Sequence, residues 1–148
     1  MRIAADGEIL ARANHELKGY WRRPDETAEA LTGGWLRTGD GGTFEDGYLT
    51  VSDRKKDMII TGGENVASLE VENRLRSHPA VADVAVIGVP DVRWGETIKA
   101  CVVPAPGVSV TGGDLIAHAR SGLAHYKAPT SVEFLALLPR TATGKVQK

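Results

Sequence analysis

The sequence has a single cysteine, Cys101, so an intramolecular disulfide and a cysteine-rich metal site are both excluded. Long apolar runs are missing too. The longest, at positions 84–89, is far shorter than a membrane-spanning helix, and the first residues lack the apolar core of a signal peptide. Because 18 Lys and Arg stand against 19 Asp and Glu, no basic surplus is available for nucleic acid. We therefore expect a cytoplasmic chain with no transmembrane segment and no nucleic-acid partner.

Metal-ligand spacing is also missing. The four histidines have neither Cys nor acidic residues at distances that build a metal site, so no metal is expected. His118 and His125 are predicted to share one helix face as ordinary surface residues. Cys101 lies within an apolar strand, where a small buried side chain is the simplest interpretation.

What the sequence has is an ordinary globular composition, with 42% hydrophobic and 25% charged residues among 148. Residues 1–53 predict short strands and turns, with a helix over 24–31 that begins at proline and a tight hairpin at Asp46-Gly47. From residue 57 the predicted order is strand, helix, strand, strand, helix, strand. The strands are expected at 58–61, 81–89, 97–103 and 132–138, the second and third pairing antiparallel across a loop at 90–96.

The two helices of this second part have recognisable starts. Ser68 is predicted to cap a helix that runs to about Arg76. Thr111 is predicted to cap the other, with Asp114 three residues on, and Leu115, Ala119 and Leu123 share its apolar face. Strands with helices packed on them indicate the α+β class.

A boundary between two parts is predicted at residues 53–57, where five polar or charged residues separate two apolar strands. The part after it, about 90 residues, can bury a modest core. Residues 1–53 are near the lower limit for a self-sufficient core.

Four local features allow a functional and an ordinary interpretation. Asp40 is either a turn aspartate or a carboxylate that binds a ribose diol. Arg54 is a solvated charge or a donor to the same sugar. Gly62-Gly63 is a bend, or a place where a ligand approaches the backbone closely. Lys145 is a solvated lysine, as most are, or a cation that neutralises charge developing between a carboxylate and a phosphate.

Three motifs, in this order, point to a family. Residues 34–40 read GWLRTGD, residues 53–66 read DRKKDMIITGGENV, and residues 139–145 read PRTATGK. Together they resemble the adenylate-forming superfamily, which includes acyl-CoA synthetases, luciferases and the adenylation domains of peptide synthetases. The resemblance covers essentially the whole chain. It implies that residues 1–53 are the end of a large N-terminal domain, an incomplete β-barrel segment. Residues 54–56 would be a hinge and residues 57–148 a small α+β C-terminal domain.

The resemblance also implies roles for individual residues. Asp40 matches the aspartate that binds both ribose hydroxyls of ATP, and Arg54 matches the arginine that contacts the same ribose. Lys56 occupies the hinge position. Lys145 matches the catalytic lysine of the first half-reaction, in which a carboxylate attacks the α-phosphate of ATP.

A second group matches the site of the second half-reaction, in which a thiol displaces AMP. Gly63 matches the glycine that lines the pantetheine tunnel, and Gly62 and Glu64 flank it. Trp94 matches a tryptophan near bound CoA, although a packed anchor beside a turn explains it equally well. The GGENV sequence resembles acyl-CoA synthetases, so CoA is favoured over a carrier protein. Of the basic residues that some CoA ligases place over 126–130, only Lys127 is present.

The expected reaction uses ATP, CoA and a small-molecule carboxylic acid, a fatty acid by overall similarity, and Mg²⁺ enters with ATP in the complete enzyme. The resemblance implies that the phosphate loop and the acyl pocket belong to the N-terminal domain, in a part that would lie upstream of residue 1. We therefore expect a C-terminal fragment or truncated product, inactive alone and without a bound cofactor.

The partial barrel of residues 1–53 is expected to expose strand edges, which pair with a second copy or leave part of the barrel disordered. The alternative is a non-catalytic small domain that binds a nucleotide, CoA or a partner chain, or is inert.

Overall fold

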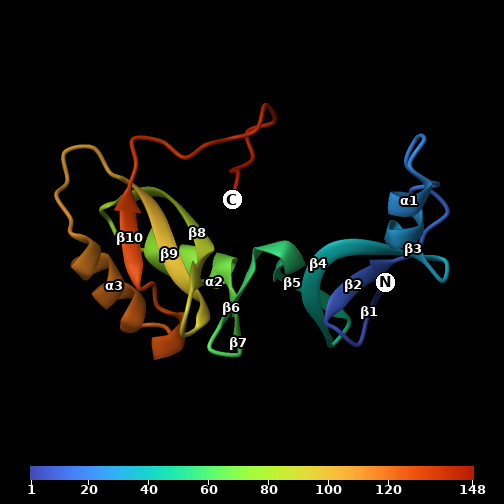
Figure 1. The fold of residues 1–148 in the computed structure, drawn as a ribbon, viewed down its shortest axis with the longest axis horizontal. Helices are drawn as coiled ribbons and strands as arrows, with labels where there is room; N and C mark the ends of the chain where they lie inside the picture. Colours follow the sequence, from blue (N-terminus) through green and yellow to red (C-terminus); the bar gives the residue numbers. More distant parts are fainter. The chain divides into compact units, whose positions relative to one another are not determined.

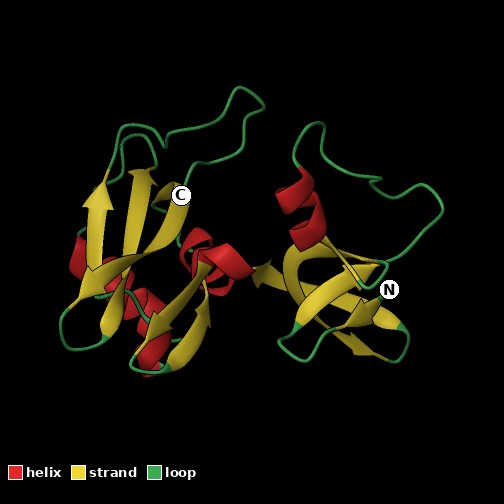
Figure 2. Cartoon of the chain, turned by 45° about the vertical axis from the view of Figure 1, so that its right-hand side comes forward, coloured by secondary structure: helices red, strands yellow, loops and turns green.

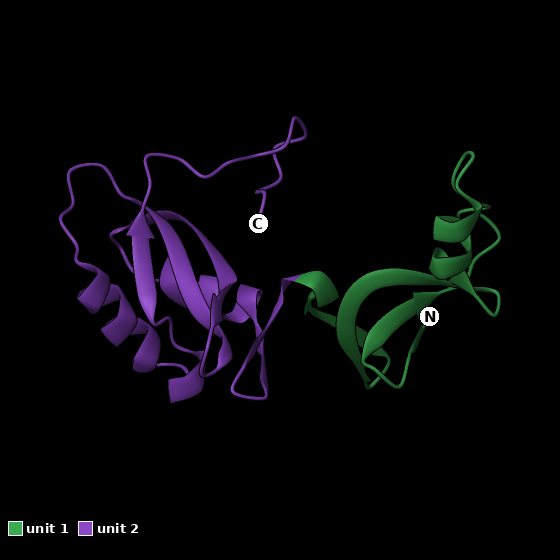
Figure 3. Cartoon of the chain, in the orientation of Figure 1, with its two compact units in different colours: residues 1–56 green, residues 57–148 purple.

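The computed structural model describes all 148 residues. They form two compact units, Met1–Lys56 and Asp57–Lys148 (Figures 1 and 3). Each unit has its own five-stranded sheet. The chain has both helices and largely antiparallel strands, so the predicted α+β class is confirmed. None of its helices has the length and apolar character needed to cross a membrane.

Unit 1 is a small antiparallel sheet with one short helix (Figure 2). The sheet has the order β1-β2-β4-β3, and β5 also pairs with β4. The elements are β1 (Arg2–Ile3), β2 (Glu8–Ala11), α1 (Pro24–Ala30), β3 (Leu31–Thr32), β4 (Trp35–Glu45), β5 (Tyr48–Arg54) and a 3₁₀ turn (Lys55–Asp57) that continues into unit 2.

The predicted features of unit 1 are local ones, and they are confirmed. Proline begins α1, as expected, and its missing N–H costs nothing in the first helical turn. The β4–β5 hairpin turns at Asp46 (φ 50°) and Gly47 (φ 82°), the two positive-φ positions of a primed turn. The apolar core of this unit is small, with Ile9 and Leu10 of β2 buried.

Unit 2 is a mixed sheet of order β10-β9-β6-β7, with β8 also paired to β9. β10 runs parallel to β9, and the other pairs are antiparallel, including the predicted pair β8–β9. The elements are β6 (Met58–Thr61), β7 (Glu64–Ala67), α2 (Ser68–Arg76), β8 (Val81–Asp91), β9 (Gly95–Pro104), α3 (Gly112–Arg120), a 3₁₀ turn (His125–Lys127) and β10 (Ser131–Phe134).

The two helices of unit 2 pack against the sheet and each other: α2 contacts β8, α3 contacts β10, and the helices touch. Thr111 caps α3 in a complete capping box with Asp114, as predicted. Leu115 and Ala119 of α3 are fully buried, and Leu123 packs beside them. The core consists of Ile59, Val66, Val71, Leu75, Val84, Val86, Ile98, Ala100, Val102, Leu115, Ala119 and Ala128.

Several element boundaries differ from the sequence predictions. Strand β7 was not predicted, because Glu64 and Asn65 have low strand propensity, yet the strand pairs with β6 and buries Val66. Ser68 is the first helical residue of α2, and Ala67 occupies the cap position. The turn between β8 and β9 is shorter than the predicted loop, since the ladder continues to the pair Asp91↔Gly95.

Two further predictions near the C-terminal part were wrong. The last strand ends at Phe134, although the apolar pattern continues to Leu138, which is buried beyond the strand. His118 and His125 do not share a helix face, because α3 ends at Arg120 and His125 begins the following 3₁₀ turn.

Candidate functional site

In unit 1, Asp40 and Arg54 face each other across the β4–β5 pair. Arg54 Nε lies 3.5 Å from Asp40 Oδ1, and both side chains are partly exposed. A β-bulge creates this pairing. Continued without a shift from Glu45↔Tyr48, the ladder would place Asp40 opposite Asp53, a like charge. Instead the register shifts by one residue between Gly41 and Gly42, and Arg54 faces Asp40.

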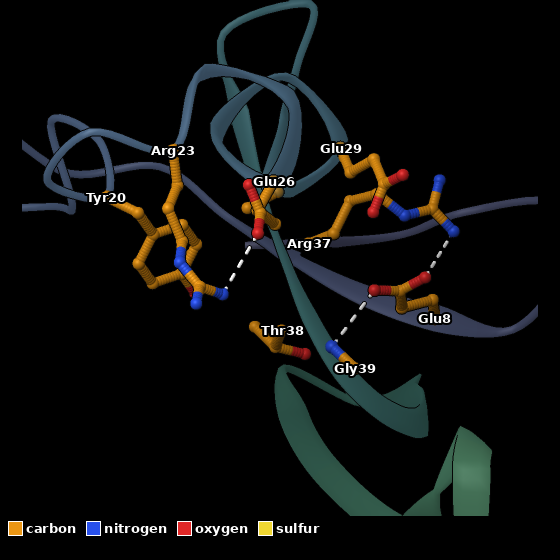
Figure 4. Close-up of a pocket in the computed structure, with 9 residues that line it drawn as sticks. Glu8, Tyr20, Arg23, Glu26, Glu29, Arg37, Thr38 and Gly39 are labelled. Carbon is orange, nitrogen blue, oxygen red and sulfur yellow. Dashed lines mark hydrogen bonds and ion pairs between the residues drawn. The ribbon is translucent and has the colours of Figure 1, made fainter.

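A buried carboxylate holds the backbone just before Asp40 in place. Glu8 is 3% exposed, and its Oε1 accepts the Gly39 N–H at 3.0 Å while Oε2 pairs with Arg37 (Figure 4). The Asp40 N–H in turn donates to the Thr38 hydroxyl at 3.2 Å. A buried carboxylate is stable only when it is paired and hydrogen-bonded, so Glu8 fixes the strand that carries Asp40.

Asp6 extends this network toward the 3₁₀ turn. Lys55 Nζ lies 2.6 Å from Asp6 Oδ2, and this hydrogen bond, with those from the Glu8 N–H and Arg37, lowers the pKa of Asp6 to about 2. The hydrogen bond to Asp6 raises the pKa of Lys55, whereas the pKa of Arg37 is raised first by its ion pair with Glu8 and then by Asp6. A groove of about 480 Å³ beside Arg54 is lined by Glu8, Thr38, Gly39, Arg54, Lys55 and Lys56. Lys56, the predicted hinge residue, is exposed at the last position of unit 1.

In unit 2, Gly62-Gly63 forms the turn between β6 and β7, with φ angles of 59° and 86°. The Gly62 N–H donates to the Trp94 carbonyl at 2.9 Å. A Cβ on Gly62 would stand 3.1 Å from Trp94 Cε3, so the indole packs directly on this turn. A Cβ on Gly63 would meet nothing within 4 Å, and its positive φ is what favours glycine there.

This turn borders a groove of about 300 Å³. Gly62, Glu64 and Trp94, three of the residues predicted from the sequence, lie along it, together with Arg120, His125 and Tyr126. The complete lining is Thr61, Gly62, Glu64, Trp94, Thr97, Arg120, His125, Tyr126, Ala128 and Thr130. Aromatic rings and a guanidinium around one groove can hold a planar anionic ligand.

The sequence did not single out Arg120 or His125, which also line this groove, and Lys127, the one basic residue of positions 126–130, pairs with an acidic side chain of α2. The Lys127 ammonium binds both carboxylate oxygens of Glu70, at 2.9 and 2.7 Å, and this contact raises its pKa. No sequence signal marks Arg120, because it reaches the groove only from the last position of α3. The Arg93 guanidinium stacks over the Trp94 indole, 4.6 Å from the ring centroid.

Lys145 lies on a loop that is itself tightly hydrogen-bonded. The Thr141 N–H donates to the Lys145 carbonyl at 2.8 Å, and the Lys145 N–H donates to the Thr141 hydroxyl at 3.2 Å. Arg140 donates to the Gly144 carbonyl at 2.8 Å and pairs with Asp83 of β8. The Lys145 side chain is exposed, and its ammonium has no hydrogen-bond or ion-pair partner in the chain. The loop therefore presents a free cation on an ordered backbone.

These residues form two separate groups, one in each unit. No cluster of three or more His, Cys, Asp or Glu that could hold a metal ion is present among the 148 residues. Cys101 lies on β9, as predicted, but is half-buried and not fully buried, and this burial raises the pKa of its thiol.

The chain is similar to a known family and to several larger proteins. The family model described as "AMP-binding enzyme C-terminal domain" matches residues 70–145. A feruloyl-CoA synthase from an Amycolatopsis species is 54% identical over 143 residues, which are 96% of this chain and 29% of that protein. A long-chain-fatty-acid–CoA ligase from Bacillus subtilis is 48% identical over 95% of this chain and 25% of its own length.

A solved structure supports the same relationship. The o-succinylbenzoate CoA synthetase from Bacillus subtilis, in complex with its acyl-adenylate intermediate, superposes with a TM-score of 0.88 at 39% identity. The match covers 94% of this chain and 28% of that one. The chain thus spans only about 29% of the length of relatives such as the feruloyl-CoA synthase. It belongs to the AMP-binding enzyme C-terminal domain family, and it corresponds to the C-terminal portion of the adenylate-forming acyl-CoA ligases.

Proposed function

We propose that this chain is the C-terminal part of an ATP-dependent carboxylic acid–CoA ligase, which forms an acyl-adenylate and then transfers the acyl group to CoA. The observation that carries the proposal is the free ammonium of Lys145 on its hydrogen-bonded loop. A cation that has no partner in the resting protein can stabilise negative charge that develops only in the transition state. The family membership and the Asp40–Arg54 pair support the same conclusion.

In the first step a carboxylate oxygen attacks the α-phosphorus of ATP, and the bond to pyrophosphate breaks. Two anions must approach each other, so an ammonium between them stabilises the transition state more than the separated reactants. We assign this role to Lys145. Asp40 would accept hydrogen bonds from the ribose hydroxyls, and Arg54 would donate to the same sugar.

In the second step the thiol of CoA displaces AMP from the acyl carbon. Lys145 has no part in this step. We propose that rotation about Lys56 withdraws Lys145 and presents the turn at Gly62, Gly63 and Glu64 to the pantetheine arm. Trp94 and Arg120 would then contact the nucleotide of CoA along the groove of unit 2.

The remaining assignments are proposals of the same kind. A fatty acid stays the predicted substrate. Because the relatives named above include ligases of an aromatic acid and of fatty acids, a panel of both is the direct test. Mg²⁺ would arrive with the phosphates of ATP, and no step is assigned to a metal held by this chain. A cytoplasmic location and pairing of exposed strand edges between copies also stay predictions.

The test compares the two half-reactions in a complete ligase that carries these residues. Lys145→Ala should reduce acid-dependent exchange of pyrophosphate into ATP by about 100-fold or more, as loss of a key electrostatic group does. Thioester formation from a preformed acyl-adenylate and CoA should stay within about threefold. Lys18→Ala, which removes an exposed lysine of unit 1, is the control.

Residues 1–148 alone should give no multiple turnovers with ATP, CoA and any acid of the panel. If the complete ligase is also inactive with every acid but still binds AMP or CoA, the protein is a non-catalytic binding module and not a ligase. Equal loss of both half-reactions in Lys145→Ala would refute the role assigned to that lysine.

A further inference from the structure

A second lysine, Lys148, ties the segment after Lys145 to the body of unit 2. Its ammonium lies 2.6 Å from Glu72 Oε1 and 2.6 Å from the Ser68 hydroxyl. Both partners belong to α2 and are buried, Glu72 at 4% exposure and Ser68 at 0%. The Lys148 side chain itself is only 18% exposed. This is unusual for a lysine, whose side chain normally extends into water.

Glu72 explains why this contact is strong. Its carboxylate also accepts the Val86 N–H of β8 at 3.0 Å and pairs with Arg76 one helical turn away at 3.2 Å. A buried carboxylate must be compensated by charge and hydrogen bonds, and Lys148 supplies one of the two cations. By contrast, the side chains of the pair Lys99–Glu133 are 30% and 48% exposed, so water screens that pair more strongly and it contributes less.

The chain between the two lysines is short. Only Val146 and Gln147 separate them, so the two Cα atoms lie within about 10 Å of each other even if this segment is fully extended. The Gln147 N–H also donates to the Pro139 carbonyl at 2.9 Å. On the other side of the loop, Arg140 is anchored to Asp83 of β8. The loop that carries Lys145 is therefore held at both ends.

We infer that Lys148 is a positioning residue for Lys145: its contact with Glu72 and Ser68 fixes the C-terminal end of the loop and so limits where the Lys145 ammonium can go. The inference about loop order rests on the contacts alone, and its consequence for adenylation rests on the proposed function. A group fixed in place before the reaction loses less freedom when it engages the transition state.

The first experiment measures loop order in the 148-residue chain by ¹⁵N relaxation. With Lys148 in place, the amides of Thr141 and Lys145 should have order parameters near the rigid value of about 0.85. Lys148→Met should lower them to below about 0.6, whereas Lys148→Arg, which keeps a cation, should restore them. Lys99→Met, which breaks a partly exposed lysine–glutamate pair elsewhere in unit 2, should leave both amides unchanged.

The strands β8 and β9 provide the folding check, because their amides should keep their order parameters in every variant. Their chemical shifts should change only beside a substitution, at the Val86 N–H, which donates to Glu72, and around position 99. If these strands keep their order and Lys148→Met leaves Thr141 and Lys145 as ordered as before, the inference is wrong. If the variant loosens the β8–β9 core as well, Lys148 serves general stability, and the positioning role is equally refuted.

The second experiment is kinetic and uses the complete ligase. Lys148→Met should slow pyrophosphate exchange by about tenfold and leave thioester formation from the preformed adenylate within about twofold, since Lys145 acts only in the first step. Lys148→Arg should recover most of the rate. An equal loss in both steps would overturn the positioning role. If the unmodified protein and all variants lack ligase activity, the proposed function is wrong, while the relaxation experiment still tests whether Lys148 orders the loop.

Discussion

The Gly62 N–H donates to the Trp94 carbonyl at 2.9 Å, and the same glycine leaves room for the Trp94 indole, which a Cβ would approach to 3.1 Å. Gly62 thus bonds the Trp94 backbone, and its lack of a side chain leaves space for the Trp94 ring. The turn at Gly62 and the groove wall at Trp94 are therefore directly coupled, although 31 positions separate these two residues in the sequence. Because the ring packs on the turn, a change at Gly62 should be transmitted to the groove.

Gly62→Asn should displace the Trp94 ring. Asn tolerates positive φ, and the corresponding first turn position of the β4–β5 hairpin is a non-glycine residue, Asp46 at φ 50°. The main cost is therefore steric, of about 1 kcal/mol. The Trp94 indole N–H resonance should shift, and KM for CoA should rise several-fold in the complete ligase. Gly47→Asn, where a Cβ would meet nothing within 4 Å, is the control and should leave that resonance in place.

Asp40→Asn and Arg54→Leu should each weaken AMP binding about tenfold or more, because each removes one partner of a charge-assisted hydrogen bond. Titration calorimetry with the complete ligase measures this. Since the two side chains face each other, the double variant should lose less than the sum of the single losses. Arg23→Leu removes an exposed arginine that pairs with Glu26 and should bind AMP normally. Full additivity would mean that the two residues act independently.

Acid should weaken unit 1 through Asp6. Its pKa in the folded chain is about 2 against an ordinary value of 3.8, so the unfolded state binds more protons between these values. The stabilisation by Asp6 is therefore present above about pH 4 and is lost as the pH falls toward 2. Lys55→Met removes the largest cause, and a carboxyl NMR titration should then show the pKa of Asp6 rising toward 3.8. An Asp6 that already titrates near 3.8 in the unmodified chain would contradict this.

Arg120→Gln should raise KM for CoA about fivefold and leave KM for ATP within about twofold. The guanidinium lines the groove beside Trp94, and a charged hydrogen-bond donor strengthens binding of an anionic nucleotide. The effect should shrink at high ionic strength because salt screens exposed charges. Steady-state kinetics of the complete ligase at two salt concentrations measures both. Lys18→Gln, a cation of unit 1, is the control, and an equal effect on both substrates would contradict a role specific to CoA.

Features that depend on a few neighbouring residues were predictable. The Asp46-Gly47 turn, the proline start of α1 and the Thr111–Asp114 capping box are all short-range arrangements whose chemistry is complete within four residues. The motifs, too, are read directly from the sequence, and they carry the family resemblance. The roles of Asp40, Arg54, Lys56 and Lys145 stay predictions that no contact in the structure tests.

Features that depend on long-range packing were not predictable. Strand β7 forms because pairing with β6 and burial of Val66 outweigh the low strand propensity of Glu64 and Asn65. Arg120 joins Trp94 only because the end of α3 reaches the groove. Lys148 finds Glu72 across 75 intervening positions.

The pair Asp40–Arg54 shows the division most clearly. The sequence determines both residues and the hairpin turn between them. Counted back from that turn, however, a regular ladder would oppose Asp40 to Asp53, two like charges. Only the tertiary structure decides otherwise. A bulge beside Gly42, where a Cβ would stand 2.5 Å from the Thr50 carbonyl oxygen, shifts the register by one residue and brings Arg54 opposite Asp40.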